Sequence, residues 1–274
     1  MSTTAIARPR VVRGAPRVTA ARVMRAEWIK LSSLRSMRIT LAVSFALMAG
    51  VGAISAAVTA ANWTNMGLGQ RATLDPATTV LSGSQFAQLA VGILGVLAIS
   101  NEYSSGMIRA TLIAVPRRLP VLWAKAAVSS AATFATMAVS ALIGFLAGGE
   151  ILAGKHLDLS LTDPAMVRAV LGAGLYLAVI GLIGVALGAL LRSTAGAIAT
   201  LVGILMLLPL LGTLLGGGFK DHIAPYLPNN AGSAIMATRQ AADTLSPWAG
   251  FAVMCAWAAA ALAAAAYTLV RRDA

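Results

Sequence analysis

Six long stretches of the chain consist almost wholly of apolar and small residues, and none of them contains Asp, Glu, Lys, Arg or His. They cover residues 39–61, 83–100, 126–149, 169–190, 196–215 and 248–270. A helix that crosses the hydrocarbon core of a bilayer needs about 20 mostly apolar residues. Barrel strands would instead alternate apolar and polar positions over about 10 residues, and these stretches do not.

The pattern therefore predicts an all-α polytopic membrane protein with six transmembrane helices, since helices satisfy their backbone polar groups without water. With their flanking residues, the spans are expected at about 39–61, 83–100, 121–149, 168–190, 194–215 and 248–270. Together they form a transmembrane domain over residues 39–270.

Composition agrees with this prediction. Hydrophobic residues make up 58% of the 274 residues and charged residues only 11%, whereas soluble domains carry about a quarter charged residues. An ordinary soluble enzyme and a disordered chain are both excluded. The lone cysteine, Cys255, excludes an intramolecular disulfide and a cysteine metal cluster.

The formal net charge of +12 is unevenly distributed along the chain. Sixteen of the 21 Lys and Arg residues lie before the first stretch, between the second and third, between the fourth and fifth, or after the last. The positive-inside rule then places both termini in the cytoplasm, including the short C-terminus at 271–274. We expect these charges to contact membrane lipids. We expect no nucleic-acid partner, because no nucleic-acid-binding motif accompanies them.

The segment before the first span divides into two parts. Residues 1–17 are rich in Arg, Pro and Gly and are predicted to be a flexible basic tail. In residues 18–38, Met24, Trp28, Leu31 and Leu34 recur roughly at helical spacing. This predicts an amphipathic helix at the cytoplasmic membrane surface, although a water-exposed extension of the first span is the alternative.

Two polar features lie toward the opposite side of the membrane. Gln85 and Gln88 are one turn apart near the end of the second span. They are candidates for lining a translocation path, or for hydrogen-bonding a neighbouring helix. The loop 216–247, which contains Tyr226, Pro228 and Asn230, is either a structured external cap or a floppy loop, with a short helix expected at 233–244.

Catalytic motifs are missing from the sequence. Residues 149–156 approach a phosphate-binding loop, but His156 stands where a Ser or Thr must bind magnesium. We therefore expect no catalytic residue, metal or cofactor on this chain. Spans without ionisable side chains also argue against an ion-coupled carrier, which needs such groups at depth.

The most distinctive loop is 101–118. Ser104 or Ser105 can cap a short amphipathic helix that Pro116 would end. Such a helix has the right size to enter a groove on a soluble partner. The alternative is a connector at the membrane surface, whose arginines touch lipid phosphates.

Three groups of residues carry a resemblance to a known family. The first is Asn101-Glu102-Tyr103 with Gly106, Ile108, Arg109, Thr111, Pro116-Arg117-Arg118 and Lys125; the second is 25–31 with 34–36; the third is 226–228 with 230–232. In these residues and in its six spans, the chain resembles the permease subunits of type-2 ATP-binding cassette (ABC) exporters, of the actinobacterial type. Ser104-Ser105 departs from the basic residue and Thr that relatives often carry.

The resemblance implies a bacterial plasma-membrane subunit that has no ATPase site. It would form the translocation path and pair with a second permease chain, identical or different, and with cytoplasmic ATPase subunits that bind Mg-ATP. The cargo would be a hydrophobic or amphiphilic compound, such as a drug, antibiotic, lipid or peptide, and the direction would be export. The alternatives are a non-transporting membrane scaffold or assembly protein and, less favoured, an ion-coupled carrier.

The resemblance also assigns residues to the ATPase-facing side. Glu102 is expected to form a charged hinge with a nearby Arg, and Gly106 to permit close approach of the partner. The full expected contact set is Glu27, Trp28, Lys30, Glu102, Tyr103, Gly106, Ile108, Arg109, Arg117 and Arg118.

Overall fold

The computed structural model describes residues 19–107, 118–155, 157, 159–215, 217–239 and 244–271. Regular structure in these ranges is helical, and six helical segments are long and apolar enough to cross a membrane, which confirms the predicted number. They are α2 (Arg35–Asn62), α5 (Ser84–Ser104), α7 (Arg118–Ala153), α8 (Pro164–Leu191), α9 (Thr194–Val202) continuing into α10 (Leu208–Leu215), and α13 (Pro247–Arg271).

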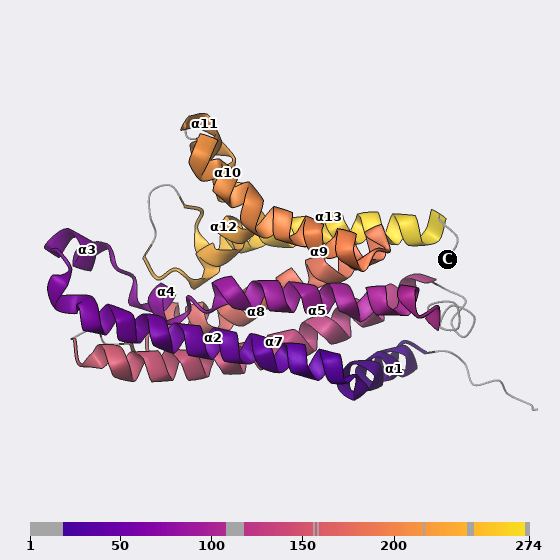
Figure 1. The fold of residues 1–274 in the computed structure, drawn as a ribbon, viewed down its shortest axis with the longest axis horizontal. Helices are drawn as coiled ribbons and strands as arrows, with labels where there is room; N and C mark the ends of the chain where they lie inside the picture. The colour runs from indigo at the N-terminus through magenta and orange to yellow at the C-terminus, as the bar shows by residue number, and fades with distance from the viewer. Residues whose placement is uncertain are drawn as a thin grey trace, which may run out of the picture.

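Helix α8 is the centre of the bundle. It packs against α5, α7 and α13, and its Tyr176, Leu177 and Ile180 side chains are fully buried. Helix α2 covers α7 and α5 from the other side (Figure 1). The remaining long helices therefore take their positions from α8, directly or through α5 and α7.

Close contact between α5 and α8 depends on glycine. A Cβ atom added at Gly95 would lie 2.1 Å from the carbonyl oxygen of Gly181, and one added at Gly184 would lie 2.2 Å from that of Gly92. Only hydrogen fits at such positions, so the two backbones approach directly. Glycines on both helices therefore allow α5 and α8 to pack closely.

The fifth span is irregular. A π-helical segment at Gly203–Leu207 joins α9 to α10, just before Pro209. Proline has no N–H and its ring crowds the carbonyl four residues earlier, so a wider turn relieves a strain that a regular helix would keep. Beyond this point α10 turns away from the bundle, and α11 (Gly217–His222) follows it (Figure 1).

Short helices close the end of the bundle that lies far from the C-terminus (Figure 1). Two follow the first span, α3 (Leu68–Thr73) and α4 (Pro76–Val80), and α12 (Pro228–Ser233) packs on α13. We call residues 224–239 the cap. The helix expected at 233–244 is wrong: it begins earlier, at Pro228, whose fixed φ suits the first helical position, and residues 237–239 have left it.

The carboxylate of Asp75 connects the cap to α4. It accepts hydrogen bonds from the Ala77 amide (3.0 Å), from the amide and hydroxyl of Thr238 (2.8 and 2.6 Å) and from the Arg239 amide (3.1 Å). One side chain therefore caps α4 and holds a segment more than 160 residues away in the sequence. We call this contact the Asp75 bridge.

The segment before the first span forms a separate helix, α1 (Ala20–Ser33), capped by the Thr19 hydroxyl. It ends because Leu34 is extended, and α2 then begins at Arg35. The predicted helix at 18–38 is thus two helices. Val23 and Glu27 form the buried side of α1, whereas Trp28 is 52% exposed. The predicted tail at 1–17 lies outside the described residues.

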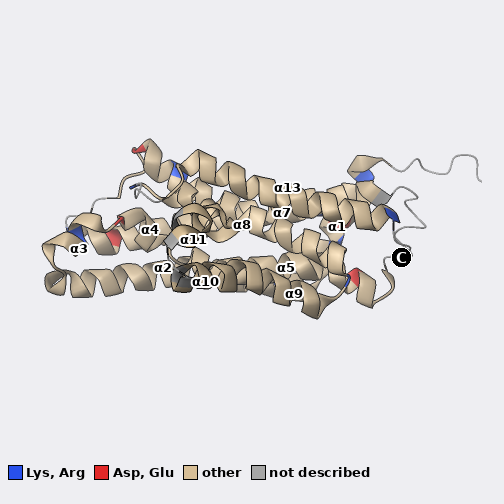
Figure 2. Cartoon of the chain, turned by 90° about the horizontal axis from the view of Figure 1, so that it is seen from above, with Lys and Arg blue, Asp and Glu red and all other residues tan. Residues whose placement is uncertain are grey.

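Among the described residues, Lys, Arg, Asp and Glu lie toward the two ends of the bundle and not in its middle (Figure 2). Helix α1 and the C-terminus share one end, while α3 and α4 lie at the other (Figures 1 and 2). An even number of spans requires this arrangement. The side of the membrane that each end faces stays a prediction from the charge distribution.

Candidate functional site: a four-charge cluster

Four ionisable side chains from three helices meet at the end of the bundle where α1 lies. Glu27 and Lys30 stand one turn apart on α1, Glu102 is in the last turn of α5, and Lys125 is in the second turn of α7. The i, i+3 spacing places the two α1 residues on one face of their helix. We call these residues the four-charge cluster.

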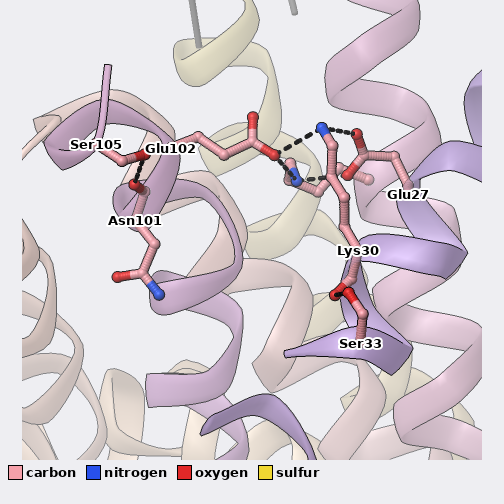
Figure 3. A network of polar contacts seen from close by, with 7 residues as sticks. Glu27, Lys30, Ser33, Asn101, Glu102 and Ser105 are labelled. Atoms are coloured by element: carbon pink, nitrogen blue, oxygen red, sulfur yellow. Dashed lines mark hydrogen bonds and ion pairs between the residues drawn. The ribbon is translucent and has the colours of Figure 1, made fainter. Parts of the chain in front are cut away.

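The cluster is a closed ring of alternating charge. The Lys30 ammonium donates to Glu27 Oε1 (2.8 Å) and Glu102 Oε1 (2.9 Å), and the Lys125 ammonium donates to Glu27 Oε2 (2.5 Å) and Glu102 Oε1 (2.9 Å). Each lysine therefore contacts both glutamates. Figure 3 shows Glu102 reaching from α5 to the α1 residues.

Burial makes this ring energetically important. Glu27, Glu102 and Lys125 are only 3–4% exposed, while the Lys30 side chain is 27% exposed. A buried charge is tolerated when opposite charges and hydrogen bonds compensate it. Here two carboxylates balance two ammonium groups. Removing one partner leaves an uncompensated charge, at a cost of about 3–5 kcal/mol.

The glutamates do not share the ring equally. Glu27 uses both carboxylate oxygens, one for each lysine, whereas Glu102 accepts both lysines at Oε1. Its Oε2 is buried without a hydrogen-bond partner among the described residues, and Figure 3 shows it turned away from the lysines. Glu102 thus keeps one buried carboxylate oxygen without a hydrogen-bond partner among the described residues.

The ring also tunes Lys30. Burial by itself lowers the pKa of this ammonium, but hydrogen bonds to Glu27 and Glu102 and their negative charges outweigh burial. The pKa of Lys30 is therefore raised above its ordinary value, and its ammonium keeps its proton throughout the physiological range.

The described ion pairs of Glu102 differ from the expected one. We expect a nearby arginine from the resemblance, whereas among the described residues Glu102 pairs with Lys30 and Lys125; Arg109 and Arg117 lie outside the described ranges. Nor is Glu102 a solvated surface carboxylate. In the sequence, Lys125 counts only among the charges that determine topology and as part of the family resemblance, and its ion pairs with the glutamates were not predicted. The available signal was an acid placed directly at the end of an apolar stretch, where it needs a compensating cation.

The other residues of the expected contact set lie around the cluster or outside the described ranges. The Arg192 guanidinium lies 5.4 Å from the centre of the Tyr103 ring, a cation–π contact. Gly106 has a φ of +70°, and no atom of the described residues lies within 4 Å of an added Cβ. Its backbone conformation therefore favours glycine.

Trp28 is exposed. Arg118 begins α7, and Ile108, Arg109 and Arg117 fall in the undescribed stretch 108–117. The structure therefore brings together Glu27, Lys30 and Glu102 from the expected set and adds Lys125 to them.

At the opposite end, Gln88 contacts a neighbouring helix. The buried Tyr176 hydroxyl of α8 forms hydrogen bonds with Gln88 Oε1 and with Asn229 Oδ1 of α12. The Gln88 amide in turn donates to the backbone oxygen of Gln85 at 3.0 Å. This polar contact joins α5, α8 and the cap. Gln85 itself is exposed.

The three expected cap residues take different places. Pro228 is buried at the start of α12, and the Asn230 amide donates to the Ala224 carbonyl at 2.8 Å. Tyr226 is half exposed, and its carbonyl accepts from the Trp257 indole at 3.0 Å. Together these contacts hold the described part of the cap as a folded structure.

Within the described ranges, no group of three or more His, Cys, Asp or Glu residues is arranged to hold a metal ion. Comparison with known proteins identifies no family: neither a protein-family model nor a curated protein matches this chain.

Proposed function

We propose that this chain is the membrane-spanning subunit of an ATP-driven transporter, and that a separate ATPase binds at the end of the bundle that carries the four-charge cluster. The observation that carries this proposal is the cluster itself. It ties α1, which lies outside the spans, to the ends of two transmembrane helices through charged contacts.

The connection suits force transmission between a soluble partner and the membrane. Helix α1 packs on α7 and α2, and the cluster fixes it to the two helix ends that flank residues 105–117. A partner that moves α1 and this connection together would shift α5 and α7 as well. Because α5 contacts α8 across glycines, that shift would reach the centre of the bundle. Packed helices move as rigid bodies in this way.

The distribution of ionisable groups agrees with an external energy source. The six apolar stretches carry no acidic or basic side chain in their interiors, and proton- or sodium-coupled carriers use such groups at depth. Nucleotide-driven transport needs none there, because the energy is delivered by the partner. The cargo that we propose is a hydrophobic or amphiphilic compound, and the membrane is the bacterial plasma membrane.

The test is purification of the tagged full-length chain from its own cells in a mild detergent, followed by assay of vanadate-sensitive ATPase activity in the eluate. We expect a copurifying ATPase. Replacing residues 104–114 with a Gly/Ser linker should abolish its recovery. The matched control replaces 154–163, the connection between α7 and α8 at the opposite end, and should leave recovery unchanged.

Two outcomes would contradict the proposal. The first is an eluate without ATPase activity even after chemical cross-linking in cells, which would favour a scaffold. The second is equal loss of the ATPase in both linker variants. That result would mean that binding does not depend specifically on the end that carries the four-charge cluster. Monodisperse elution of every variant shows that the chain is still folded.

A further inference from the structure

A cavity of about 320 Å³ lies between the start of α5 and the cap, at the end of the bundle opposite the four-charge cluster. This volume is within the range of small-molecule sites, roughly 300–1,000 Å³. Leu81 and Met236, both buried, supply apolar wall. Ser84 and Gln85 line it from α5, and Asn230 and Ser233 line it from α12.

Several polar groups in this cavity have unused hydrogen-bonding capacity. Ser84 lines the cavity from the first turn of α5 and is 2% exposed. Gln85 accepts from Gln88 at Oε1, which leaves its own NH₂ donors unused. The Asn230 amide donates to Ala224, which leaves its carbonyl oxygen as an acceptor. Gln85 and Asn230 are exposed, so these groups can hydrogen-bond a ligand that enters the cavity.

The chemistry of the lining narrows the ligand class. Its polar groups are hydroxyls and carboxamides, which together offer both donors and acceptors. Among the described lining residues Arg239 is the single charged one. Its guanidinium donates to the Ala72 carbonyl at 2.5 Å, and its backbone amide is held by Asp75. A ligand with several neutral hydroxyl groups, each donor and acceptor, complements this set.

We propose that this cavity binds the uncharged, hydroxyl-rich headgroup of an amphiphile, of the glycosyl or glycerol class, with Ser84, Gln85 and Asn230 as its hydrogen-bonding residues. The apolar wall at Leu81 and Met236 contacts the carbon face of the headgroup. This inference concerns binding alone and holds whether or not the chain works with an ATPase.

The test uses thiol protection, which the chain permits because Cys255 is its only cysteine. In a Cys255→Ser background, Ser233→Cys places a thiol in the cavity wall. Ser160→Cys places one on an exposed connection at the same end. The full-length protein is reconstituted in nanodiscs and labelled with a charged methanethiosulfonate reagent. The probes are octyl β-glucoside, octyltrimethylammonium and octyl sulfate, each below its critical micelle concentration.

Octyl β-glucoside should slow labelling at position 233 saturably, because an occupied cavity excludes the reagent. The rate should fall by 1 + [probe]/Kd, about fourfold at three times Kd. Labelling at position 160 should not change. Adding Ser84→Ala or Gln85→Leu should weaken protection by about fivefold or more per lost hydrogen bond, since one such bond contributes roughly 1 kcal/mol.

Equal protection by all three probes, or equal protection at position 160, would show nonspecific partitioning and overturn the proposal. Stronger protection by octyl sulfate than by octyl β-glucoside would show that the cavity prefers an anionic headgroup, and would overturn the proposal of an uncharged one. Absence of protection at any probe concentration would show that the cavity holds water only. Because no nucleotide or ATPase enters this assay, its failure is distinguishable from failure of the proposed transport function.

Discussion

At the scale of single residues, the four-charge cluster depends on charge balance more than on any one contact. Glu102→Gln preserves the shape of the side chain but leaves two ammonium groups with only Glu27. Lys30→Met in the same chain restores neutrality and leaves the Glu27–Lys125 ion pair intact. The double variant should therefore be more stable than Glu102→Gln alone.

We expect a favourable coupling between these two substitutions of about 0.5–3 kcal/mol, as is found for contacting residues. Thermal unfolding followed by tryptophan fluorescence in one fixed detergent measures it. Lys30→Met alone completes the double-mutant cycle. Strict additivity of the two losses would mean that the residues do not act as a ring.

The raised pKa of Lys30 predicts a loss of stability at alkaline pH. A lysine whose pKa is higher in the folded state stabilises the fold fully below its unfolded pKa, about 10.4. That contribution disappears as pH rises through the folded value. Wild-type Tm should thus fall more steeply above roughly pH 10.4 than the Tm of Lys30→Met. Parallel curves for the two proteins would contradict the raised pKa.

At the scale of elements, the approach of α5 to α8 is set by backbone atoms that cannot move aside. Gly95→Ala places a methyl group 2.1 Å from the Gly181 carbonyl oxygen, and overpacking of this kind costs about 1–3 kcal/mol. The matched control is Gly50→Ala on α2, where nothing lies within 4 Å. Since alanine favours the helix more than glycine does, the Tm of Gly50→Ala should equal or exceed that of the wild type. Equal effects on Tm would show that α5 and α8 do not pack this closely.

The Asp75 bridge gives a second prediction for an element. Asp75→Ala removes the cap of α4 and the acceptor that holds Thr238 and Arg239, so the segment containing the exposed Arg239 should open more often. Trypsin cleavage after Arg239 should accelerate by at least about tenfold, because charge-assisted hydrogen bonds contribute about 1.5–3 kcal/mol each.

The control for this prediction is Asp163→Ala. Asp163 caps α8 through the Ala165 amide at 2.8 Å, and among the described residues it makes no hydrogen bond to the cap. It should therefore leave the rate of cleavage after Arg239 unchanged. If both variants accelerate cleavage equally, loss of a helix cap, and not of the bridge, is the cause.

At the scale of the whole molecule, the six spans and the shared end of α1 and the C-terminus predict a defined orientation. In a Cys255→Ser background, a thiol introduced by Ser160→Cys should react with a membrane-impermeant maleimide in intact cells. One introduced by Ser105→Cys should react only after the cells are opened. Both serines are exposed in the fold, so the reversed pattern would invert the predicted topology.

The sequence predicted the number of spans because burial in a bilayer demands long uncharged stretches, and these are visible in one dimension. It did not predict the break at Leu34, the π-helical segment or the position of α12, because these depend on local backbone geometry. It placed Glu27, Lys30 and Glu102 in one functional set, but through resemblance. The role of Lys125 needed the three-dimensional structure, since 98 residues separate it from Glu27.

The position of α12 also constrains how the protein is made. Helix α12 contacts residues that precede it and residues that follow it in the sequence. Asn229 forms a hydrogen bond with Tyr176, and an added Cβ at Gly232 would collide with Tyr176 and with Met254 of α13. The first partner leaves the ribosome before α12 and the second after it. The cap therefore reaches its final packing only once the last span has been synthesised and inserted. Until then the nascent chain carries an incompletely packed cap, which makes closure of this end a late step of biogenesis.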